Sequence, residues 1–422
     1  MKIKFKVRLL PVAFLAMILP VSAQFTYNSP YSRYGIGNLY QVVNAHNAAM
    51  GGLKYGINGA YLVNPSNPAS YTAFRKNYFT FDAGLNGSAA RLTAGSKSRD
   101  EGHFNLNNLA FGVPLGDRWG GAFGLIPFSS VGYSISEHNL HPDFGGYNTI
   151  YEGNGGINRA FAGLAAKITP DLSVGVNANF MFGSLNYIRT VVFDSTYYLN
   201  LRSRQSRIIH DVSFDAGLQY NKILNESRGI SLTAGVMAGI PSRLSGREDI
   251  LTETFKYSGS NVVVIRDTVE NVSGAEGTMN LPLQLAGGVS LKRAERWMAG
   301  VDFAWQDWSG FSAFGTVDSL KPAFQMAVGG EYKLNSILLR AGLRYQQSYL
   351  EIRSNQLNEV GISFGVGLPV YNKNYSVSMI SMGLEAGMRG TTDDGLIQER
   401  FGRLWLGFTM SQERWFKRRE YN

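Results

Sequence analysis

Cysteine is absent from the 422 residues, so the chain can form no disulfide and no thiolate metal site. Histidine is nearly as scarce, with five scattered copies. His138, His141 and Asp143 are the one group with metal-like spacing, and Pro142 and the glycines after it favour an exposed loop instead. We therefore predict no metal site and no cofactor.

The sequence also lacks the usual marks of enzymes and nucleic-acid-binding proteins. No phosphate-binding glycine loop occurs, and Gly-x-Gly pairs such as Gly365-Val366-Gly367 precede no predicted helix. His210 beside Asp211 has no third polar group or nucleophile with it in the sequence. The net charge of +9 comes from lysines and arginines scattered along the chain rather than from a basic stripe. We predict that the protein is not an enzyme and binds no nucleic acid.

Long apolar runs are missing after the first 23 residues, which excludes a helical membrane protein. The start of the chain has four basic residues by position 8, an apolar run from Leu9 to Val21, and the small-residue site Val21-Ser22-Ala23. This order predicts a cleavable signal peptide over residues 1–23.

What the sequence has in abundance is glycine, aromatic side chains and two-residue alternation. Glycine accounts for 49 residues and aromatic residues for 13%. From Leu172 to Phe182, apolar residues alternate with Ser173, Gly175 and asparagines, as in a strand between lipid and water. Strands of 9 to 12 residues suit a tilted bilayer crossing better than a soluble all-β protein, the alternative. We predict an all-β, transmembrane antiparallel barrel of about 14 strands in the outer membrane.

The barrel is expected over residues 73–413, with a basic C-terminal tail at 414–422. Residues 24–72 do not alternate and contain several prolines and a glycine pair, so they cannot form central strands. Their many aromatic and apolar side chains favour a hatch inside the lumen over the alternative, a flexible periplasmic tail. Residues 137–155 and 241–278 are expected to be outer loops, the second with a hairpin that pairs 250–257 with 262–269.

The chain resembles the FadL-type long-chain fatty acid transport family. The resemblance rests on an ordered set of motifs and is clear for residues 44–90 and 279–370. The set comprises Gly51-Gly52, Asn67-Pro68-Ala69, Leu281-Pro282, Asp307-Trp308-Ser309-Gly310-Phe311, Val328-Gly329-Gly330-Glu331-Tyr332, Leu339-Arg340-Ala341-Gly342 and Phe364-Gly365-Val366-Gly367. It implies a 14-stranded barrel closed by an N-terminal hatch, with Gly51, Gly52, Asn67, Pro68 and Ala69 as the hatch motif.

The function that the resemblance implies is passive uptake of hydrophobic or amphipathic, fatty-acid-like molecules. Arg340 and Arg344 are candidates for binding a ligand carboxylate, and a salt-bridge ladder with the inward Asp215, Asp302, Glu331 and Glu385 is their alternative. An anchoring barrel for secreted or surface proteins is the alternative function, and a polar porin fits the long N-terminal segment poorly. Expected partners are outer-membrane lipid, lipopolysaccharide, an apolar or amphipathic ligand and the barrel assembly machinery.

Overall fold

The computed structural model describes residues 29–40, 44–258, 262–294, 296–371 and 377–413. The predicted signal peptide and basic tail lie outside these residues. Strands dominate, and the helical segments are three to six residues long. The elements are η2 (Pro30–Arg33), β1 (Asn38–Leu39), α2 (Ala45–Ala48), η3 (Pro68–Ala73), β2 (Tyr78–Ala94), β3 (Lys97–Pro114), β4 (Trp119–His141), β5 (Gly145–Lys167), β6 (Leu172–Phe193), β7 (Asn200–Asn225), β8 (Ile230–Gly239), β9 (Ser242–Ser258), β10 (Val262–Leu281), β11 (Gln284–Arg293), β12 (Trp297–Gln306), η4 (Trp308–Gly310), β13 (Ser312–Ala313), β14 (Thr316–Val317), β15 (Ala323–Leu334), β16 (Ile337–Ile352), β17 (Asn355–Tyr371), β18 (Val377–Arg389), η5 (Asp393–Gly395) and β19 (Gln398–Glu413).

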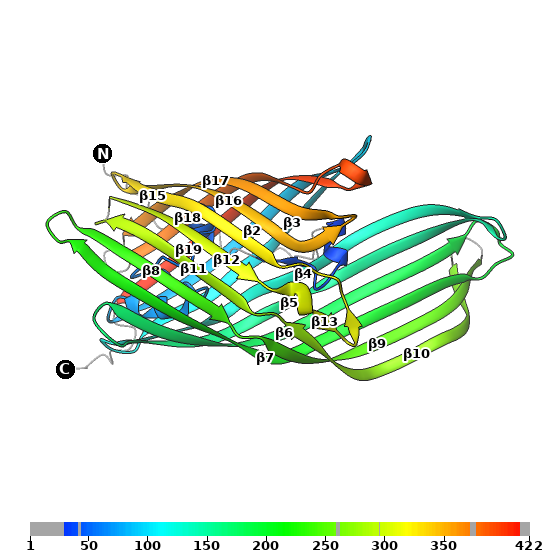
Figure 1. Cartoon of the computed structure of the whole chain (residues 1–422), viewed down its shortest axis with the longest axis horizontal. Coiled ribbons are helices and arrows are strands. Elements are labelled where there is room, and N and C mark those ends of the chain that lie inside the picture. Colours follow the sequence, from blue (N-terminus) through cyan, green and yellow to red (C-terminus); the bar gives the residue numbers. More distant parts are fainter. Residues whose placement is uncertain (1–28, 41–43, 259–261, 295, 372–376, 414–422) are drawn as a thin grey trace, which may run out of the picture.

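Fourteen antiparallel strands close into a barrel, as the sequence predicts (Figure 1). Each pairs with the next in chain order, except that β8 pairs with β11 and β12 with β15. The last strand closes the sheet on the first, with Glu413 opposite Tyr78. No helix among the described residues is long and apolar enough to cross a membrane.

The barrel wall is apolar outside and polar inside, which confirms the alternation. On β6, Val176 and Phe180 are 57% and 47% exposed, whereas Asn177 and Asn179 are each 1% exposed. An outer surface of this kind is stable against lipid tails. Inside, polar groups form hydrogen bonds, as where the Asn177 side-chain amide donates to the Pro65 carbonyl at 2.9 Å. The chain is therefore an outer-membrane barrel.

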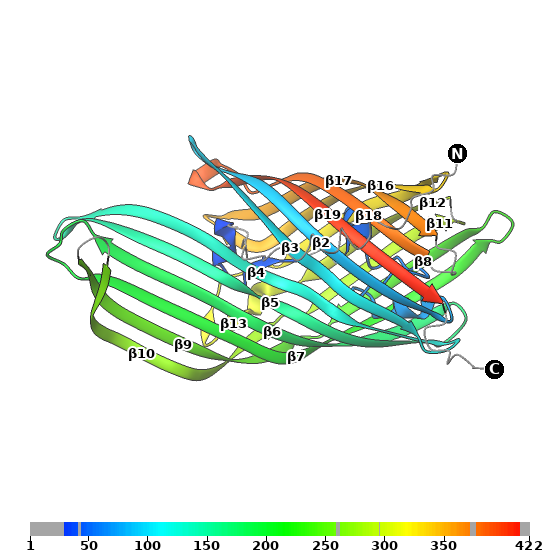
Figure 2. The same cartoon turned by 180° about the vertical axis from the view of Figure 1, so that it is seen from behind.

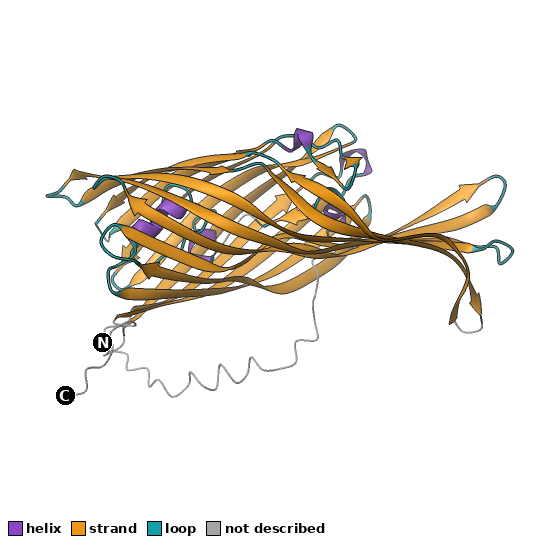
Figure 3. Cartoon of the chain, turned by 90° about the horizontal axis from the view of Figure 1, so that it is seen from below, coloured by secondary structure: helices purple, strands orange, loops and turns teal. Residues whose placement is uncertain are grey.

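A curved sheet projects beyond one end of the closed barrel (Figures 1 and 3). It consists of the far parts of β4 to β7 together with the β9–β10 hairpin. β7 is 26 residues long and changes partner along its length, from β9 at residues 200–209 to β8 at 215–225. The hairpin predicted within 241–278 is confirmed and is longer than expected. We call this projecting sheet the extension.

The prediction that residues 137–155 form a loop was wrong. Glu137 pairs with Thr149 in a continuous β4–β5 ladder, and only residues 142–144 separate the two strands. Outside a membrane both faces of a strand can meet water, so the sequence need not alternate there even though the backbone ladder continues. The alternation of apolar and polar residues is therefore absent from this segment, although the segment is a pair of strands.

The extension lies on the external side of the membrane. Turns at the other end of the barrel, where β19 ends, are short, for example 115–118, 168–171 and 335–336. The connections at the extension's end include the long segments 307–322 and 390–397. Short turns face the periplasm in outer-membrane barrels and longer loops face outward.

Candidate functional site

The N-terminal segment fills the lumen, as predicted for a hatch. We call its described residues, 29–40 and 44–73, the plug. Ile36, Met50 and Leu53 have no exposed surface. Within it, α2 and η3 are short turns whose caps are Asn44 and Asn67. The lumen is therefore a packed interior around a few small cavities, and not an open pore.

The predicted glycine pair lies where the plug backbone touches the barrel wall. Gly51 and Gly52 have φ angles of +69° and +87°, which side chains with a Cβ rarely adopt. The Gly51 amide donates to the Ser363 Oγ at 2.8 Å. A Cβ on the wall residue Gly342 would lie 2.2 Å from the Gly51 nitrogen. Glycine is thus required on both sides of this contact.

The Asn67-Pro68-Ala69 motif is a second joint between plug and wall. The Asn67 Oδ1 accepts from the Ala69 amide at 3.2 Å, and its Nδ2 donates to the Tyr55 carbonyl at 3.0 Å. Pro68 lies against Gly175 of β6, where a Cβ would come within 2.5 Å of the Pro68 carbonyl carbon. These residues hold the plug in place, and any direct role in ligand binding stays a prediction.

Inward-facing wall glycines are the feature that sequence reasoning missed. At Gly288, Gly235 and Gly120 an added Cβ would clash with the plug backbone, as at Gly175 and Gly342. All five glycines face the plug from the barrel wall. Glycines at inward positions of several strands therefore indicated that the backbone of another segment, and not water, lies against the inside of the wall.

Asp302 anchors the middle of the plug. Its carboxylate accepts from the amides of Lys54 at 2.5 Å, Tyr55 at 2.9 Å and Gly56 at 3.4 Å. Burial lowers the pKa of the Lys54 side chain to about 8, and the charge of Asp302 opposes this shift. The plug thus carries a buried cation beside the wall carboxylate that anchors it.

The two arginines proposed as ligand-binding residues are both paired with carboxylates. The Arg344 Nη2 lies 2.6 Å from Glu359 and 2.7 Å from Glu385. The Arg340 Nε lies 2.7 Å from Glu331, and its Nη1 donates to Ser381 at 3.1 Å. This geometry is the salt-bridge ladder that we gave as the alternative. That either arginine also meets a ligand stays a prediction.

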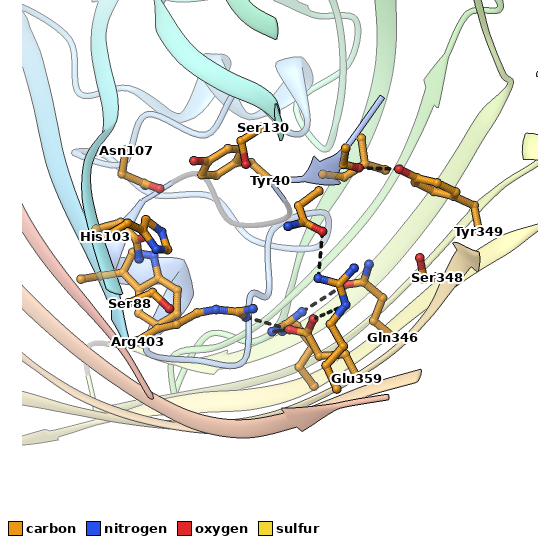
Figure 4. A pocket seen from close by; sticks show the side chains of 17 residues that line it. Tyr40, Ser88, His103, Asn107, Ser130, Gln346, Ser348, Tyr349, Glu359 and Arg403 are labelled. Carbon is orange, nitrogen blue, oxygen red and sulfur yellow. Dashed lines mark hydrogen bonds and ion pairs between the residues drawn. The ribbon is translucent and has the colours of Figure 1, made fainter. Parts of the chain in front are cut away.

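Arg344 belongs to a larger cluster that joins plug and wall, and Figure 4 labels two of its members, Glu359 and Arg403. Arg403 bridges Glu359 at 2.7 Å and Glu385 at 3.3 Å. Arg389 lies 3.8 Å from Glu399 and donates to the plug residue Asn38 at 2.8 Å. The Ser29 hydroxyl in turn donates to Glu399 at 2.5 Å. We call Arg344, Arg389, Arg403, Glu359, Glu385 and Glu399 the charge cluster.

A cavity of about 110 Å³ lies between the charge cluster and the plug (Figure 4). Its wall combines hydroxyl, amide and aromatic groups. Two buried polar atoms that face this region, the Ser88 Oγ and the Asn38 Nδ2, have no hydrogen-bond partner among the described residues. The lining residues are Gly37, Asn38, Leu39, Tyr40, Asn86, Ser88, His103, Asn107, Ser130, Arg344, Gln346, Ser348, Tyr349, Glu359, Arg389, Arg403 and Trp405.

Beside this cavity the barrel wall opens between two strands. The β3–β4 ladder runs only from Pro114–Gly120 to Leu109–Leu125, and in the described structure the two strands have no pairs beyond it. Figure 2 shows β3 and β4 running apart toward the external end. We call this gap the seam.

Plug residues occupy the seam. β1 pairs with β4, Leu39 opposite Ser129, and the Tyr40 amide donates to the Phe128 carbonyl at 3.0 Å. From the other side, Asn105 of β3 donates to the Tyr40 hydroxyl at 3.3 Å. Tyr40 therefore bridges the two strands that have separated, and it also lines the cavity.

The histidines of the predicted exposed loop lie at the far tip of the extension. His141 and Asp143 approach to 3.7 Å, and the ring of His141 stacks on Phe144 with centroids 3.9 Å apart. Among the described residues, no group of three or more His, Asp or Glu side chains could hold a metal ion. At the tip, His141 therefore packs against an aromatic ring and does not belong to a metal-binding group.

Comparisons with known proteins support this architecture. A family model described as BamG matches residues 5–422. Among solved structures, a Pseudomonas aeruginosa FadL homologue is 12% identical, with a TM-score of 0.59 over 90% of this chain and 100% of its own. The Ralstonia pickettii toluene transporter TbuX is 14% identical, with a TM-score of 0.56 over 87% and 98%. The Pseudomonas putida toluene transporter TodX is 16% identical, with a TM-score of 0.56 over 88% and 99%. No curated protein matches the chain.

The structural neighbours agree with the resemblance read from the sequence. At identities of 12–16% their likeness establishes the shared fold, a FadL-type barrel, and not a common substrate.

Proposed function

We propose that this chain, which belongs to the BamG family, is an outer-membrane conduit for small hydrophobic or amphipathic molecules. Such molecules would exchange between the lumen and the membrane through the seam between β3 and β4. Passage would be driven by concentration and by burial of apolar surface, at about 25 cal/mol per Å².

The observation that carries this proposal is the seam filled by residues 38–40. Backbone pairing closes barrel walls, and an unpaired stretch of wall is costly in lipid unless something covers it. Here the cover is a two-residue strand and one tyrosine, which few hydrogen bonds hold. The rest of the plug is held by close contacts with wall glycines and by Asp302. Movement of the whole plug would therefore break more contacts than movement of residues 38–40 alone.

The neighbours' descriptions are consistent with hydrophobic substrates. TbuX and TodX are described as toluene transporters, and CymD as a monoaromatic hydrocarbon channel. Their fold is that of this chain, so a hydrophobic substrate class is the natural proposal here as well.

A disulfide across the closed seam tests the proposal. Leu39 and Ser129 are directly opposite in the β1–β4 pair, where Cα atoms lie about 4.5–5.5 Å apart, within disulfide range. The native chain has no cysteine to interfere. In the double variant Leu39→Cys, Ser129→Cys, oxidation should reduce uptake of labelled toluene by intact cells to the level of cells without the protein. Reduction should restore it.

The matched control is a disulfide in the extension. Ser136 and Ile150 are opposite in the β4–β5 ladder, away from the seam. The variant Ser136→Cys, Ile150→Cys should transport equally well oxidised and reduced. Equal uptake by the oxidised and reduced forms of the seam variant would refute passage through the seam.

A second function, as a scaffold within the barrel assembly machinery, is favoured by a different observation. The family designation BamG points to that machinery, and the extension offers a large external surface. At its tip an aromatic cluster joins the β4–β5 and β6–β7 connections, with Phe193 and Tyr198 centroids 5.4 Å apart and Tyr197 83% exposed. Exposed aromatic residues of this kind are frequent hot spots of protein interfaces.

This second candidate predicts a specific co-purification. The full chain, extracted in mild detergent, should retain subunits of the barrel assembly machinery identified by mass spectrometry, with no apolar ligand. The double variant Phe144→Ser, Tyr197→Ser should lose them while toluene uptake is unchanged. Retention of the same subunits by this variant would rule out the tip as their docking site.

A further inference from the structure

We infer that the cavity beside the charge cluster binds a neutral, hydroxylated group, so that the conduit prefers phenols or the hydroxyl heads of uncharged amphiphiles to carboxylates. This inference rests on the proposed function, because ligands must reach the cavity from the membrane. It also revises the fatty-acid-like expectation that the sequence resemblance implies.

The first argument is that the arginines lining the cavity are already neutralised. Arg344, Arg389 and Arg403 face it, and three glutamates hold them within 4.0 Å. The six side chains therefore carry no net charge when ionised. A carboxylate entering the cavity would lose its hydration and would have to displace a glutamate to gain an arginine, which is unfavourable in a buried site.

The same balance holds for the other buried cations of the lumen. Arg159 lies 3.3 Å from Asp215, and Arg340 pairs with Glu331. Lys54 is accompanied by Asp302, whose carboxylate accepts the Lys54 amide. At these three places too, an anionic ligand would meet a cation that already has a carboxylate beside it.

The second argument is that the cavity offers unused neutral hydrogen-bonding groups. Ser88 is 8% exposed, and its hydroxyl has no partner among the described residues. The Asn38 Nδ2 is similarly unpaired, although its Oδ1 accepts from Arg389. A buried polar atom without a partner costs roughly 1–3 kcal/mol, so such groups usually meet water or a ligand. A hydroxyl both donates and accepts, and it therefore suits a site that contains both kinds of group.

The third argument is size and shape. An apolar cavity of about 150 Å³ can hold one benzene ring. The volume here is about 110 Å³, so a hydroxyl head group fits inside and a ring must lie partly outside the enclosed volume. Tyr40 and Tyr349, which Figure 4 labels, and Trp405 add aromatic groups to the polar lining. One small ring or one head group is the largest occupant, and an attached chain would have to continue along the seam past Tyr40.

Three probes of similar size separate the possibilities. Binding of 4-methylphenol, toluene and benzoate to the purified full-length barrel in detergent can be measured by isothermal titration calorimetry at pH 7.5, after subtraction of micelle partitioning. We expect saturable binding of 4-methylphenol, weaker binding of toluene, and the weakest binding of benzoate. Benzoate binding equal to or tighter than 4-methylphenol binding would overturn the inference, as would the absence of saturable binding, which indicates a cavity for water only.

The variant Ser88→Ala removes the unpaired hydroxyl without adding bulk. It should weaken 4-methylphenol binding about three- to tenfold, the value of one hydrogen bond, and leave toluene binding unchanged. The matched control is Ser411→Ala on the neighbouring β19, a buried serine that does not line the cavity. It should bind all three probes as the native chain does. Equal loss in both variants would assign the effect to packing and count against the site.

A gain of binding gives the sharpest test of the charge argument. Glu359→Gln keeps the shape of the side chain and leaves the charge cluster with an excess positive charge. Benzoate should then bind more tightly than 4-methylphenol, which reverses the native order, and no reversal would refute the charge argument. These outcomes are independent of the seam disulfide, so a failure of transport and a failure of ligand selection are told apart.

Discussion

The closed barrel and the extension use the same strands in opposite ways. Within the barrel each of the fourteen strands has two neighbours, and plug and wall fill the space inside. In the extension, β4 beyond Val131 is paired on one side only among the described strands, and β10 meets a strand other than β9 at the single pair Met279–Ala313. One part of β4 to β7 therefore encloses an interior, whereas the other presents a surface.

Charged side chains are buried inside the closed barrel and partly exposed in the extension. Inside the barrel, the side chain of Arg344 is 3% exposed and sits between two buried glutamates. In the extension, the side chain of Arg204 is 41% exposed in its pair with Glu253. Buried ion pairs are costly to break, and exposed ones contribute little. Stability should thus reside in the barrel, and the extension should tolerate change.

The largest expected effect comes from removal of the plug. Deletion of residues 29–73 leaves a 14-stranded barrel without its filling, and its strand number is close to that of the 16–18-stranded porins, which hold an aqueous channel. Single-channel conductance in planar bilayers should rise on the order of tenfold or more. Deletion of residues 142–144 at the extension's tip is the control and should change nothing. Unchanged conductance without the plug would show that something else closes the lumen.

The next effect separates a buried arginine from an exposed one. Arg344→Met should lower the free energy of unfolding by roughly 3–5 kcal/mol, because it leaves Glu359 and Glu385 buried with a smaller positive charge nearby. Arg204→Met should cost less than about 1 kcal/mol. Urea unfolding in lipid vesicles measures both. Similar costs for the two variants would mean that the charge cluster is solvated.

The sequence predicted the barrel because a membrane imposes a strict pattern on strands. In β16, Leu339 and Leu343 face outward while Arg340 and Arg344 face inward, and this alternation alone identifies the two faces. The plug was predictable for the opposite reason, since prolines and glycines in an apolar segment fit neither strand nor helix. Strand alternation and the backbone effects of proline and glycine act on single residues, so both could be recognised in the sequence alone.

The candidate site was much less predictable, because its contacts join distant parts of the chain. Arg344 was identified as facing the lumen, but Glu359, Arg389 and Arg403 come from three other strands, and their pairing depends on register. Tyr40 carries no local pattern at all, since its role follows from the early end of the β3–β4 ladder. The inward glycines were not used in the prediction, although many of them mark contacts with the plug.

A smaller effect should distinguish two adjacent glycines of β11. A Cβ on Gly288 would lie 1.9 Å from the Asp302 Oδ1 and 2.7 Å from the Gly56 nitrogen, whereas on Gly287 the nearest atom would be 3.5 Å away. Gly288→Ala should therefore cost about 1–3 kcal/mol by overpacking, and Gly287→Ala should be neutral. The unfolding midpoint in urea tests the pair. Equal midpoints would mean that the plug adjusts freely to the wall.

The smallest effect on stability is expected at the tip of the extension, because its exposed side chains lie far from the packed interior of the barrel. Tyr197 is 83% exposed and its ring contacts only Tyr198 among the described aromatic residues. Tyr197→Ser should change the free energy of unfolding by no more than about 0.5 kcal/mol, because little apolar surface is lost from the interior. The same urea titration measures it, with Gly287→Ala as a reference of equal expected size. A loss as large as that of Gly288→Ala would mean that barrel and extension unfold as one cooperative unit, since only then would a surface contact so far from the plug contribute to the stability of the whole sheet.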